Sequence, residues 1–368
     1  MELRYYIIFA VVALVLQLFL FIFDRTLRWL FQPVLSKKTL SLLSSLVFMG
    51  TNAVIFLTIF RVYPQFRVSA FILVFLLYNS FIALGGWALL TCCKRGQNVT
   101  KFDRTLFNGT LRLLYPIALA SLFGLSIYNA YTPNVLHYQI QINKPLPALR
   151  IGVASDFHLG TLFGGKQIDE LAAIFNREKV DLILLPGDIM DDNVNAYLAE
   201  KMQPHLAKLK APLGVYATLG NHDFFGDKIR VAQEIRQAGL QLLEDESVVV
   251  NHQFVLIGRN DEMAVNRPET KTLLQTVDTK MPIFLMDHRP TDVMKHSQLP
   301  IDLQVSGHTH KGQIFPANLF TILMYDLAYG YKQLGNGHYF VTSGYGFWGI
   351  PLRLGSQSEV LIIDVIGK

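Results

Sequence analysis

The sequence predicts a membrane-embedded N-terminal segment followed by an α/β domain, and three observations support this prediction. Four apolar runs, each of about 19 or 20 residues, fall within the first 135 of the 368 residues. After about Leu149, short apolar strands alternate with helical stretches, which is the pattern of an α/β domain. All ten histidines lie after residue 135, so we expect acid–base or metal chemistry only in the second part of the chain.

The four apolar runs contain no charged residue and no histidine. At 1.5 Å per helical residue, each run is long enough to span a hydrocarbon core of about 30 Å. A secretory signal would need a cleavage site of small residues after the first run, and a transport path would need an ionisable group inside the membrane. The segment is therefore interpreted as an anchor of four transmembrane helices, with apolar runs at Tyr5–Phe23, Leu42–Phe60, Phe71–Leu90 and Leu113–Tyr131.

Charge is divided unevenly along the chain. Residues 1–135 hold 12 Lys and Arg against 3 Asp and Glu, whereas the remainder holds 21 against 25. The second part therefore lacks the excess of basic residues that is typical of a nucleic-acid-binding domain. Nine positive residues lie in the loops Asp24–Ser41 and Thr91–Arg112, against four on the opposite side. The positive-inside rule then predicts an integral plasma (inner) membrane protein whose C-terminal domain faces outside, in the periplasm or its equivalent.

The second part of the chain contains eight candidate strands and two clear amphipathic helices. We expect helices over Lys166–Lys179 and Asp227–Ala238, where apolar residues recur at helical spacing. The predicted division is a membrane anchor at 1–135, an extended linker at 136–148 that contains Pro145 and Pro147, and an α/β domain at 149–368. The candidate strands are Leu149–Ala154, Leu182–Leu185, Val215–Leu219, Phe254–Ile257, Ile283–Met286, Leu303–Val305, Tyr339–Thr342 and Val360–Val365.

Polar clusters follow five of these strands. Ligands gather at the carboxyl ends of strands in α/β sheets, so we expect the five clusters to converge. They offer oxygen and imidazole ligands without thiolate, a set that suits Mn²⁺, Fe, Zn²⁺ or Mg²⁺. Seven candidate ligands exceed the needs of one ion, and two ions that share a carboxylate fit the count. The clusters are Ser155–His158, Pro186–Asp188, Gly220–Asp223, Asp287–Pro290 and Ser306–His310.

In this order the clusters resemble the motif series of the calcineurin-like metallophosphoesterases, which runs D-x-H, G-D, G-N-H-D/E, H and G-H-x-H. The resemblance covers roughly residues 149–366. Gly307–Gln313 and the glycine-rich segment Ser343–Gly346 further resemble a branch of membrane-associated and secreted bacterial phosphoesterases. The resemblance implies a four-layer αββα sandwich and metal-dependent hydrolysis of a phosphate ester.

The resemblance also implies a role for each motif residue. Asp156, His158 and His310 would hold the first metal, Asn221, His288 and His308 would hold the second, and Asp188 would bridge them. His222 would give a proton or hydrogen bond to the departing oxygen, and Asp223 would orient its ring. Two divalent ions are implied, with manganese favoured over iron, zinc or magnesium. They would clamp the phosphoryl oxygens during in-line attack.

Several residues near the motifs have two interpretations. Arg289 and Lys311 are candidate substrate contacts, although Lys311, which stands where the branch commonly has glycine, would equally well face solvent. Asp191 and Asp192 are interpreted as caps of a helix around Asn195–Leu209, with contact to Asp188 as the alternative. The apolar segment Phe315–Tyr331 either forms a lip toward the membrane or packs under the sandwich.

The sequence therefore predicts a membrane-anchored, dinuclear-metal phosphoesterase. Its partners would be a phosphorylated substrate and membrane lipid, and we expect no nucleic acid. Whether the substrate is a monoester, a diester or a pyrophosphate stays open, as does its linkage to a lipid. The alternative from another class is a non-catalytic membrane sensor or scaffold on the same fold. Loss of metal ligands would indicate that alternative, and none of the seven is missing.

Overall fold

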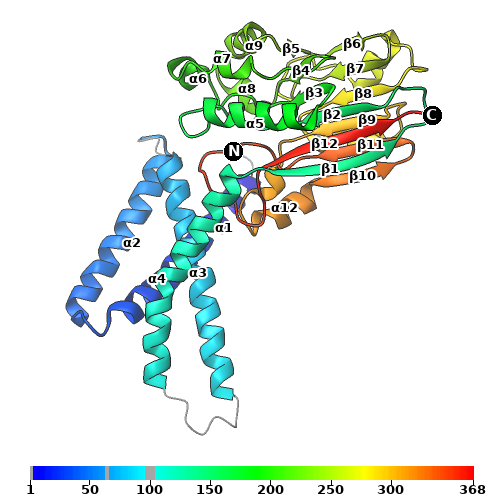
Figure 1. Cartoon of the computed structure of the whole chain (residues 1–368). Coiled ribbons are helices and arrows are strands. Elements are labelled where there is room, and N and C mark those ends of the chain that lie inside the picture. Colours follow the sequence, from blue (N-terminus) through cyan, green and yellow to red (C-terminus); the bar gives the residue numbers. More distant parts are fainter. Residues whose placement is uncertain (1–2, 63–65, 96–103) are drawn as a thin grey trace. The chain divides into compact units, whose positions relative to one another are not determined.

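The computed structural model describes residues 3–62, 66–95 and 104–368, and the chain divides into two compact units, Met1–Gly124 and Leu125–Lys368. The first unit is helical (Figure 1). Within the described ranges, four helices are long and apolar enough to cross a membrane, and each contains most of one predicted run. They are α1 (Leu3–Phe31), α2 (Lys37–Ile59), α3 (Phe66–Arg95) and α4 (Arg104–Tyr131), whose last turns belong to the second unit.

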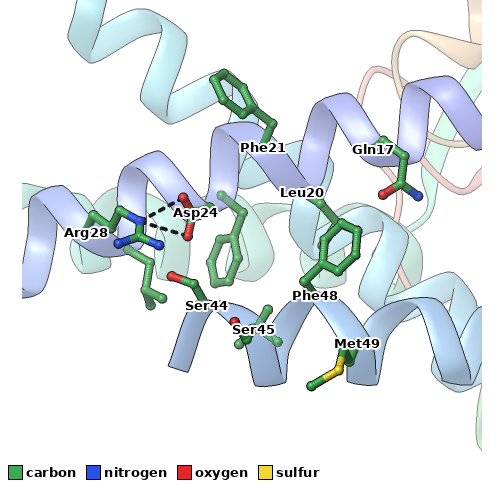
Figure 2. Close-up of a pocket in the computed structure, with 12 residues that line it drawn as sticks. Gln17, Leu20, Phe21, Asp24, Arg28, Ser44, Ser45, Phe48 and Met49 are labelled. Atoms are coloured by element: carbon green, nitrogen blue, oxygen red, sulfur yellow. Dashed lines mark hydrogen bonds and ion pairs between the residues drawn. The ribbon is translucent and has the colours of Figure 1, made fainter. Parts of the chain in front are cut away.

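The first unit places polar side chains between its helices. Gln17 Nε2 donates to Asn52 Oδ1 at 2.9 Å, and the Tyr115 hydroxyl donates to Asn79 Oδ1 at 2.7 Å. Such pairs join helices where the surrounding hydrocarbon offers no hydrogen bonds. A cavity of about 410 Å³ lies along α1 and α2, and its lining includes Asp24 and Arg28, whose side chains pair one turn apart (Figure 2). This charge is therefore neutralised within its own helix.

The second unit contains two six-stranded sheets among its described residues. The first sheet has the order β1-β12-β2-β3-β4-β5, with β12 antiparallel to β2 and its other neighbouring pairs parallel. The second has the order β10-β11-β9-β8-β7-β6. The strands of the first sheet are β1 (Asn134–Gln141), β2 (Leu149–Val153), β3 (Leu182–Pro186), β4 (Val215–Thr218), β5 (Gln241–Leu242) and β12 (Glu359–Ile366). Those of the second are β6 (Glu246–Val250), β7 (Phe254–Gly258), β8 (Ile283–Met286), β9 (Leu303–Ser306), β10 (Gly330–Leu334) and β11 (Gly337–Val341).

Helices cover the outer faces of both sheets, so the predicted αββα sandwich is confirmed (Figure 1). Alternation along β12 shows the layering, because Ile362 packs with the helices and Leu361 and Ile363 pack between the sheets. The first sheet is covered by α5 (Gly165–Glu178), α6 (Asn195–Ala199), α7 (Gln203–Leu206), α8 (Asn221–Phe225) and α9 (Lys228–Gln237). Short helices α10 (Thr270–Leu273) and α11 (Val293–His296) lie on the second, and α12 (Ala317–Met324) follows β9.

The predicted linker at 136–148 is wrong for its first half. Residues Asn134–Gln141 form β1, which pairs with β12 from Asn134↔Glu359 to Gln141↔Ile366. Only Thr132 and Pro133 separate α4 from this strand, so no long linker lies between them. The physical reason is that β1 is an edge strand with one half-exposed face, and it lacks the continuous apolar run of a central strand.

The last turns of α4 pack on the sandwich. The Ser126 carbonyl accepts from the Arg353 amide at 2.9 Å, and the Asn129 carbonyl accepts from the Ser358 amide at 2.8 Å. Ala130 is fully buried in the cluster between the first sheet and its helices. The end of the fourth apolar helix is therefore part of the second unit.

Candidate metal centre

Five strand ends bring the predicted ligands together. The neighbouring parallel strands β2, β3 and β4 end just before Asp156, Asp188 and Asn221. In the second sheet the parallel neighbours β8 and β9 end just before His288 and His308. Parallel strands place their carboxyl ends at one edge, so the two stacked sheets present their clusters at a common rim.

The backbone at this rim adopts conformations that non-glycine residues rarely take. Five of the predicted ligands have positive φ: Asp156 (55°), His158 (48°), Asp188 (53°), His308 (71°) and His310 (47°). Sparsely populated conformations of this kind concentrate at functional sites. Glycines leave room for the carboxylates, because a Cβ at Gly220 would lie 2.2 Å from Asp188 Oδ1 and one at Gly307 would lie 2.2 Å from Asp156 Oδ2.

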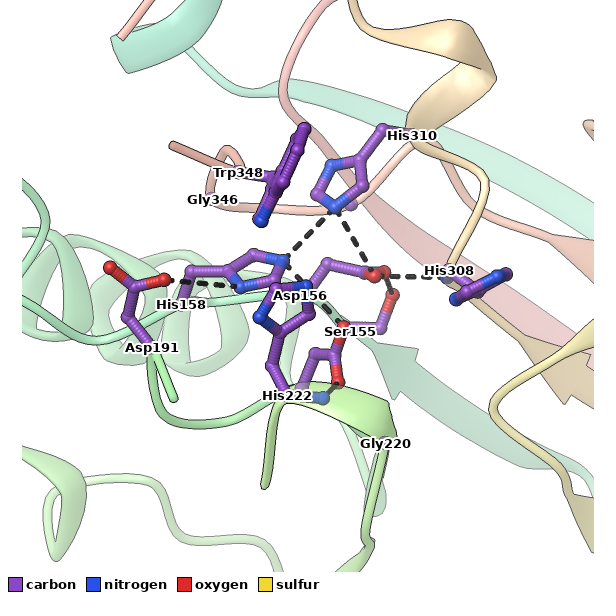
Figure 3. Close-up of polar contacts among 12 residues, drawn as sticks. Ser155, Asp156, His158, Asp191, Gly220, His222, His308, His310, Gly346 and Trp348 are labelled. Carbon is purple, nitrogen blue, oxygen red and sulfur yellow. Dashed lines mark hydrogen bonds and ion pairs between the residues drawn. The ribbon is translucent and has the colours of Figure 1, made fainter. Parts of the chain in front are cut away.

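Asp156, His158 and His310 form one buried group whose ligand atoms all lie within 4.8 Å of one another. His158 Nε2 lies 3.0 Å from His310 Nε2, which in turn lies 3.5 Å from Asp156 Oδ1 (Figure 3). The Asp156 carboxylate accepts hydrogen bonds from the His308 amide and the Ser155 hydroxyl. These bonds fix the orientation of the Asp156 carboxylate, with one oxygen toward the imidazoles of His158 and His310.

Asp188, His288 and His308 form a second group of the same dimensions. Asp188 Oδ2 lies 3.1 Å from His288 Nε2 and 3.7 Å from His158 Nε2, so one carboxylate oxygen is close to both groups. Its other oxygen accepts from the His222 amide at 2.8 Å. The Pro186 carbonyl lies 2.8 Å from His288 Nδ1 and therefore accepts its proton, so Nε2 is the nitrogen of that ring that faces Asp188.

Two atoms of the predicted ligand set, His158 Nδ1 and Asn221 Oδ1, are buried without a hydrogen-bond partner. A buried polar atom left unsatisfied costs about 1–3 kcal/mol. Divalent ions would satisfy the oxygen and nitrogen atoms that face the centre, and carboxylate, amide and imidazole without thiolate suit hard or borderline ions. The residues present therefore fit a pair of metal ions.

The electrostatics of the centre favour bound cations. Burial lowers the pKa of His158 and of His308 to about 3, which keeps both imidazoles neutral at pH 7, the state in which they coordinate metals. Burial acts to lower the pKa of His288 as well, but the Asp188 charge outweighs it and raises that pKa to about 10. Although burial opposes it, the neighbouring histidines hold the pKa of Asp188 well below its usual range. Asp188 thus stays anionic and attracts positive charge.

The predicted role of Asp223 is wrong. Its carboxylate does not bond the His222 ring; it accepts from the backbone amides of Ile189, Met190 and Gly220 at 2.9–3.2 Å. The ring partner is Asp192, whose Oδ1 lies 2.5 Å from His222 Nδ1. The reason is local geometry: α8 begins at Asn221, so Asp223 folds back over its own N-terminus toward the amides after β3.

Two further acidic residues therefore belong to the centre. Asp191 Oδ1 lies 3.9 Å from His158 Nδ1, and Asp191, His158 and His222 form a third group that could hold an ion. Neither Asp191 nor Asp192 caps α6, whose N-cap is Val194. Their position, three and four residues after Asp188, is compatible with a place near the metal ligands. The same position is equally compatible with the cap of the helix that follows.

Arg353 is a buried residue of the centre that the motifs did not assign. Its Nη2 lies 3.1 Å from His310 Nδ1 and also donates to the carbonyls of Ser343 at 2.7 Å and Gly346. Its side chain is fully buried, and burial lowers the pKa of Arg353 to about 10. The guanidinium therefore orients His310 and holds together the glycine-rich segment that passes over the rim.

Neither candidate substrate contact points freely into the centre. Arg289 makes two hydrogen bonds to the buried carboxylate of Asp261, at 2.7 and 2.9 Å. Lys311 Nζ lies 4.1 Å from the centroid of the Tyr329 ring. The structure thus gives both cations structural partners, and a role for either one in substrate binding remains a prediction.

Comparison with known proteins agrees with this geometry. Residues 149–312 match the family described as calcineurin-like phosphoesterase. A protein of Aquifex aeolicus (strain VF5) described as a metallophosphoesterase is 34% identical over 251 residues, which cover 65% of this chain and 94% of that protein. The chain belongs to the calcineurin-like phosphoesterase family. Members of this family hydrolyse phosphate esters with the help of metal ions, and this phosphoesterase has the family's motifs at its strand ends.

Other relatives extend the likeness. A metallophosphoesterase of Helicobacter pylori (strain J99 / ATCC 700824) is 30% identical over 70% of this phosphoesterase and 71% of its own length. A "transmembrane protein with metallophosphoesterase domain" of Danio rerio is 28% identical over 69% of this chain and 62% of its own. Among solved structures, a 5'-nucleotidase precursor from Thermus thermophilus aligns with 59% of this chain and 55% of its own, at 16% identity and a TM-score of 0.38.

Proposed function

We propose that this chain is a membrane-anchored phosphoesterase that uses two divalent ions, with manganese as the favoured metal. One observation carries the proposal: Asp188 Oδ2 lies 3.1 Å from an imidazole nitrogen of one ligand group and 3.7 Å from that of the other. A carboxylate placed in this way can bridge two ions. Asp156, His158 and His310 would hold one of them, and Asn221, His288 and His308 the other.

Two divalent ions in such a site activate water and stabilise the charge on the phosphoryl oxygens during in-line displacement. The protein's own contribution is to hold the ligands and move a proton. Burial acts to lower the pKa of His222, but its hydrogen bond to Asp192 and the nearby Asp188 charge raise it. His222 therefore binds a proton more readily than a free imidazole, and it would give that proton to the departing oxygen.

The direct connection between α4 and β1 supports a substrate that lies at the membrane, such as a lipid-linked phosphate ester. Two residues, Thr132 and Pro133, span at most about 7 Å. Purified protein supplied with Mn²⁺ should release phosphate or headgroup from phosphodiesters in a lipid extract. Turnover of water-soluble esters alone, with no lipid phosphate cleaved, would contradict a lipid substrate but leave the phosphoesterase assignment intact.

The reaction itself is tested with bis-(p-nitrophenyl) phosphate. Asp188→Ala should abolish Mn²⁺-dependent hydrolysis, whereas Asp326→Ala, which removes a carboxylate outside the predicted ligand set of the same unit, should leave it unchanged. Matching thermal unfolding of the two variants in the absence of metal would show that both are folded. Unchanged turnover by a folded Asp188→Ala protein would overturn the proposal.

We further propose that the catalytic unit faces the outside of the plasma membrane. The nine positive residues of the loops Asp24–Ser41 and Thr91–Arg112 support this orientation, although the second loop lies partly outside the described residues. Alkaline phosphatase fused after Lys368 should be active, and green fluorescent protein fused there should be dark. A fluorescent, phosphatase-silent pair of fusions would place the unit in the cytoplasm.

A further inference from the structure

Helix α12 presents apolar side chains to its surroundings. It follows the segment after β9 that carries His308 and His310, and none of its eight residues is buried. Four of its side chains have large exposed fractions: Phe320 (65%), Ile322 (62%), Leu323 (84%) and Met324 (71%). Soluble surfaces seldom gather large apolar residues in this way, and such a patch marks a contact site. Figure 1 shows the helix, in orange, outside the two sheets.

Hydrogen bonds place the start of this helix beside the end of α4. Phe315, just before α12, donates its amide to the Leu354 carbonyl at 2.7 Å. The adjacent residue, Arg353, donates its amide to the Ser126 carbonyl and accepts at its own carbonyl from Asn129 Nδ2 at 3.2 Å. Ser126 and Asn129 lie in the last two turns of the apolar stretch Thr105–Tyr131. The patch is thus joined through one short segment to the end of a membrane-spanning helix.

The surroundings of α12 also suit an interface between lipid and water. Trp348 is 44% exposed, and its amide and carbonyl both bond the Gln313 side chain, four residues before α12. Tryptophan and tyrosine gather at the headgroup level of membranes. The Trp348 ring lies 6.1 Å from the His222 ring, and Tyr325, directly after α12, lies 6.1 Å from the His308 ring. The apolar surface therefore extends to the rim of the metal centre.

We infer that α12 lies in the headgroup region of the bilayer that α4 crosses, with its apolar side chains inserted among the lipids. The bilayer is the occupant because hydrogen bonds through the segment 353–354 hold the start of α12 beside the last turns of α4, a helix long and apolar enough to cross a membrane. A short helix with an apolar face inserts to this shallow depth. The contact holds the metal centre at the membrane surface. It requires that α4 span a bilayer and does not depend on the reaction that the centre performs.

Site-specific fluorescence tests this contact in the full-length protein. In a background with Cys92→Ser and Cys93→Ser, a single cysteine is introduced by Leu323→Cys and labelled with an environment-sensitive NBD group. The matched control is Ile229→Cys on α9, whose native side chain has nearly the same exposure, 80% against 84%. Both proteins are reconstituted into phosphatidylcholine–phosphatidylglycerol vesicles, with and without lipid carrying a nitroxide near the headgroup end of its acyl chain.

The label at position 323 should emit at shorter wavelength than the label at 229, and nitroxide lipid should quench it at least roughly twofold more. Equal, water-like emission at both positions without lipid quenching would overturn the inference. So would a blue-shifted label that escapes nitroxide lipid and turns water-like when protein is diluted in the vesicles. That result would show that a second copy of the chain, and not lipid, covers α12.

Discussion

The two units of this protein distribute polarity in opposite ways. In the first unit apolar side chains face outward. Only 6% to 28% of the most apolar window of each spanning helix is buried. The last of these helices continues into the second unit. Its buried polar groups, such as Asn79, meet one another between helices. The second unit has the usual arrangement, with apolar residues between and around its sheets. The difference follows from the solvent each unit meets, since lipid offers no hydrogen bonds and water offers many.

The second unit departs from its own pattern in two places. Charged side chains such as Asp156 and Asp188 are buried at the metal centre, and large apolar side chains are exposed on α12. Each departure costs stability unless a partner outside the chain compensates for it. These two departures from the polarity of the unit are the places where we propose that it meets metal ions and membrane.

Metal removal should produce the largest effect, and it should separate the two units. Treatment with a chelator should lower hydrolysis of bis-(p-nitrophenyl) phosphate at least about 1,000-fold, because the buried carboxylates lose the cations they attract. The second unit should also lose roughly 3 kcal/mol of its stability, if the ions had been present at about 100 times their Kd. Mn²⁺ should restore both activity and thermal unfolding temperature. Full activity in the chelated protein would show that the buried charges serve another purpose.

Loss of His222 should have the next largest effect. His222→Ala should lower kcat by about 100- to 10,000-fold, the usual contribution of a positioned proton donor.

Asp192→Asn should lower kcat by about tenfold with little change in unfolding temperature, since the Asp192 side chain is 53% exposed. Steady-state kinetics in Mn²⁺ measures both variants. Wild-type kcat in Asp192→Asn would show that the pairing with His222 has no catalytic consequence.

Asp223→Ala should lower stability and leave kcat almost unchanged, which is the reverse of the effect expected for Asp192→Asn. Three backbone amides would lose their acceptor, so the free energy of unfolding should fall by about 3 kcal/mol, while kcat of the folded protein changes little. Thermal unfolding and kinetics on the same sample separate the two effects. A tenfold or greater loss of kcat without loss of stability would restore Asp223 to the catalytic role that its motif implies.

Replacement of Arg353 should lower the stability of the second unit and weaken its binding of metal. Arg353→Met should lower the free energy of unfolding by about 2 kcal/mol, because the carbonyls of Ser343 and Gly346 and the His310 ring lose their common donor. It should also raise the Mn²⁺ concentration needed for half-maximal activity. Arg177→Met, at a side chain 65% exposed, is the control and should change neither quantity. Identical metal titrations of the two variants would exclude a role for Arg353 in holding His310.

The smallest effect should come from the surface pair between Arg150 on β2 and Asp364 on β12, which bond at 2.7 and 2.9 Å. The hydrogen bond from Arg150 lowers the pKa of Asp364, so its stabilisation is complete above the ordinary carboxyl pKa of about 4 and is lost as pH falls further. Asp364→Asn should cost about 0.5 kcal/mol at pH 7. Unfolding temperatures measured from pH 7 to pH 3 should converge for the two proteins. A constant difference across that range would show that the charge of Asp364 does not matter.

The four apolar helices, the central strands and the residue types that follow these strands could all be predicted from the amino-acid sequence. This was possible because spanning helices and buried strands need continuous apolar runs, and the turns after the strands need glycine, Asp, Asn and His in recognisable motifs. Eight candidate strands correspond to β2, β3, β4, β7, β8, β9, β11 and β12 within a few residues. The edge strands β1, β5, β6 and β10 lack such runs, because one side of an edge strand has no neighbouring strand.

The pairing of charged and polar atoms could be established only from the folded structure. The motif favoured Asp223 as the partner of the His222 ring, but the partner is Asp192, since the Asp223 carboxylate reaches back to the amides of Ile189, Met190 and Gly220. Arg353 meets His310 across 43 residues of chain, and β1 meets β12 across more than 200. Local pattern encodes whether a residue is buried and where the chain turns. It does not encode which distant atom arrives at hydrogen-bonding distance, because that is set by the packing of the whole sandwich.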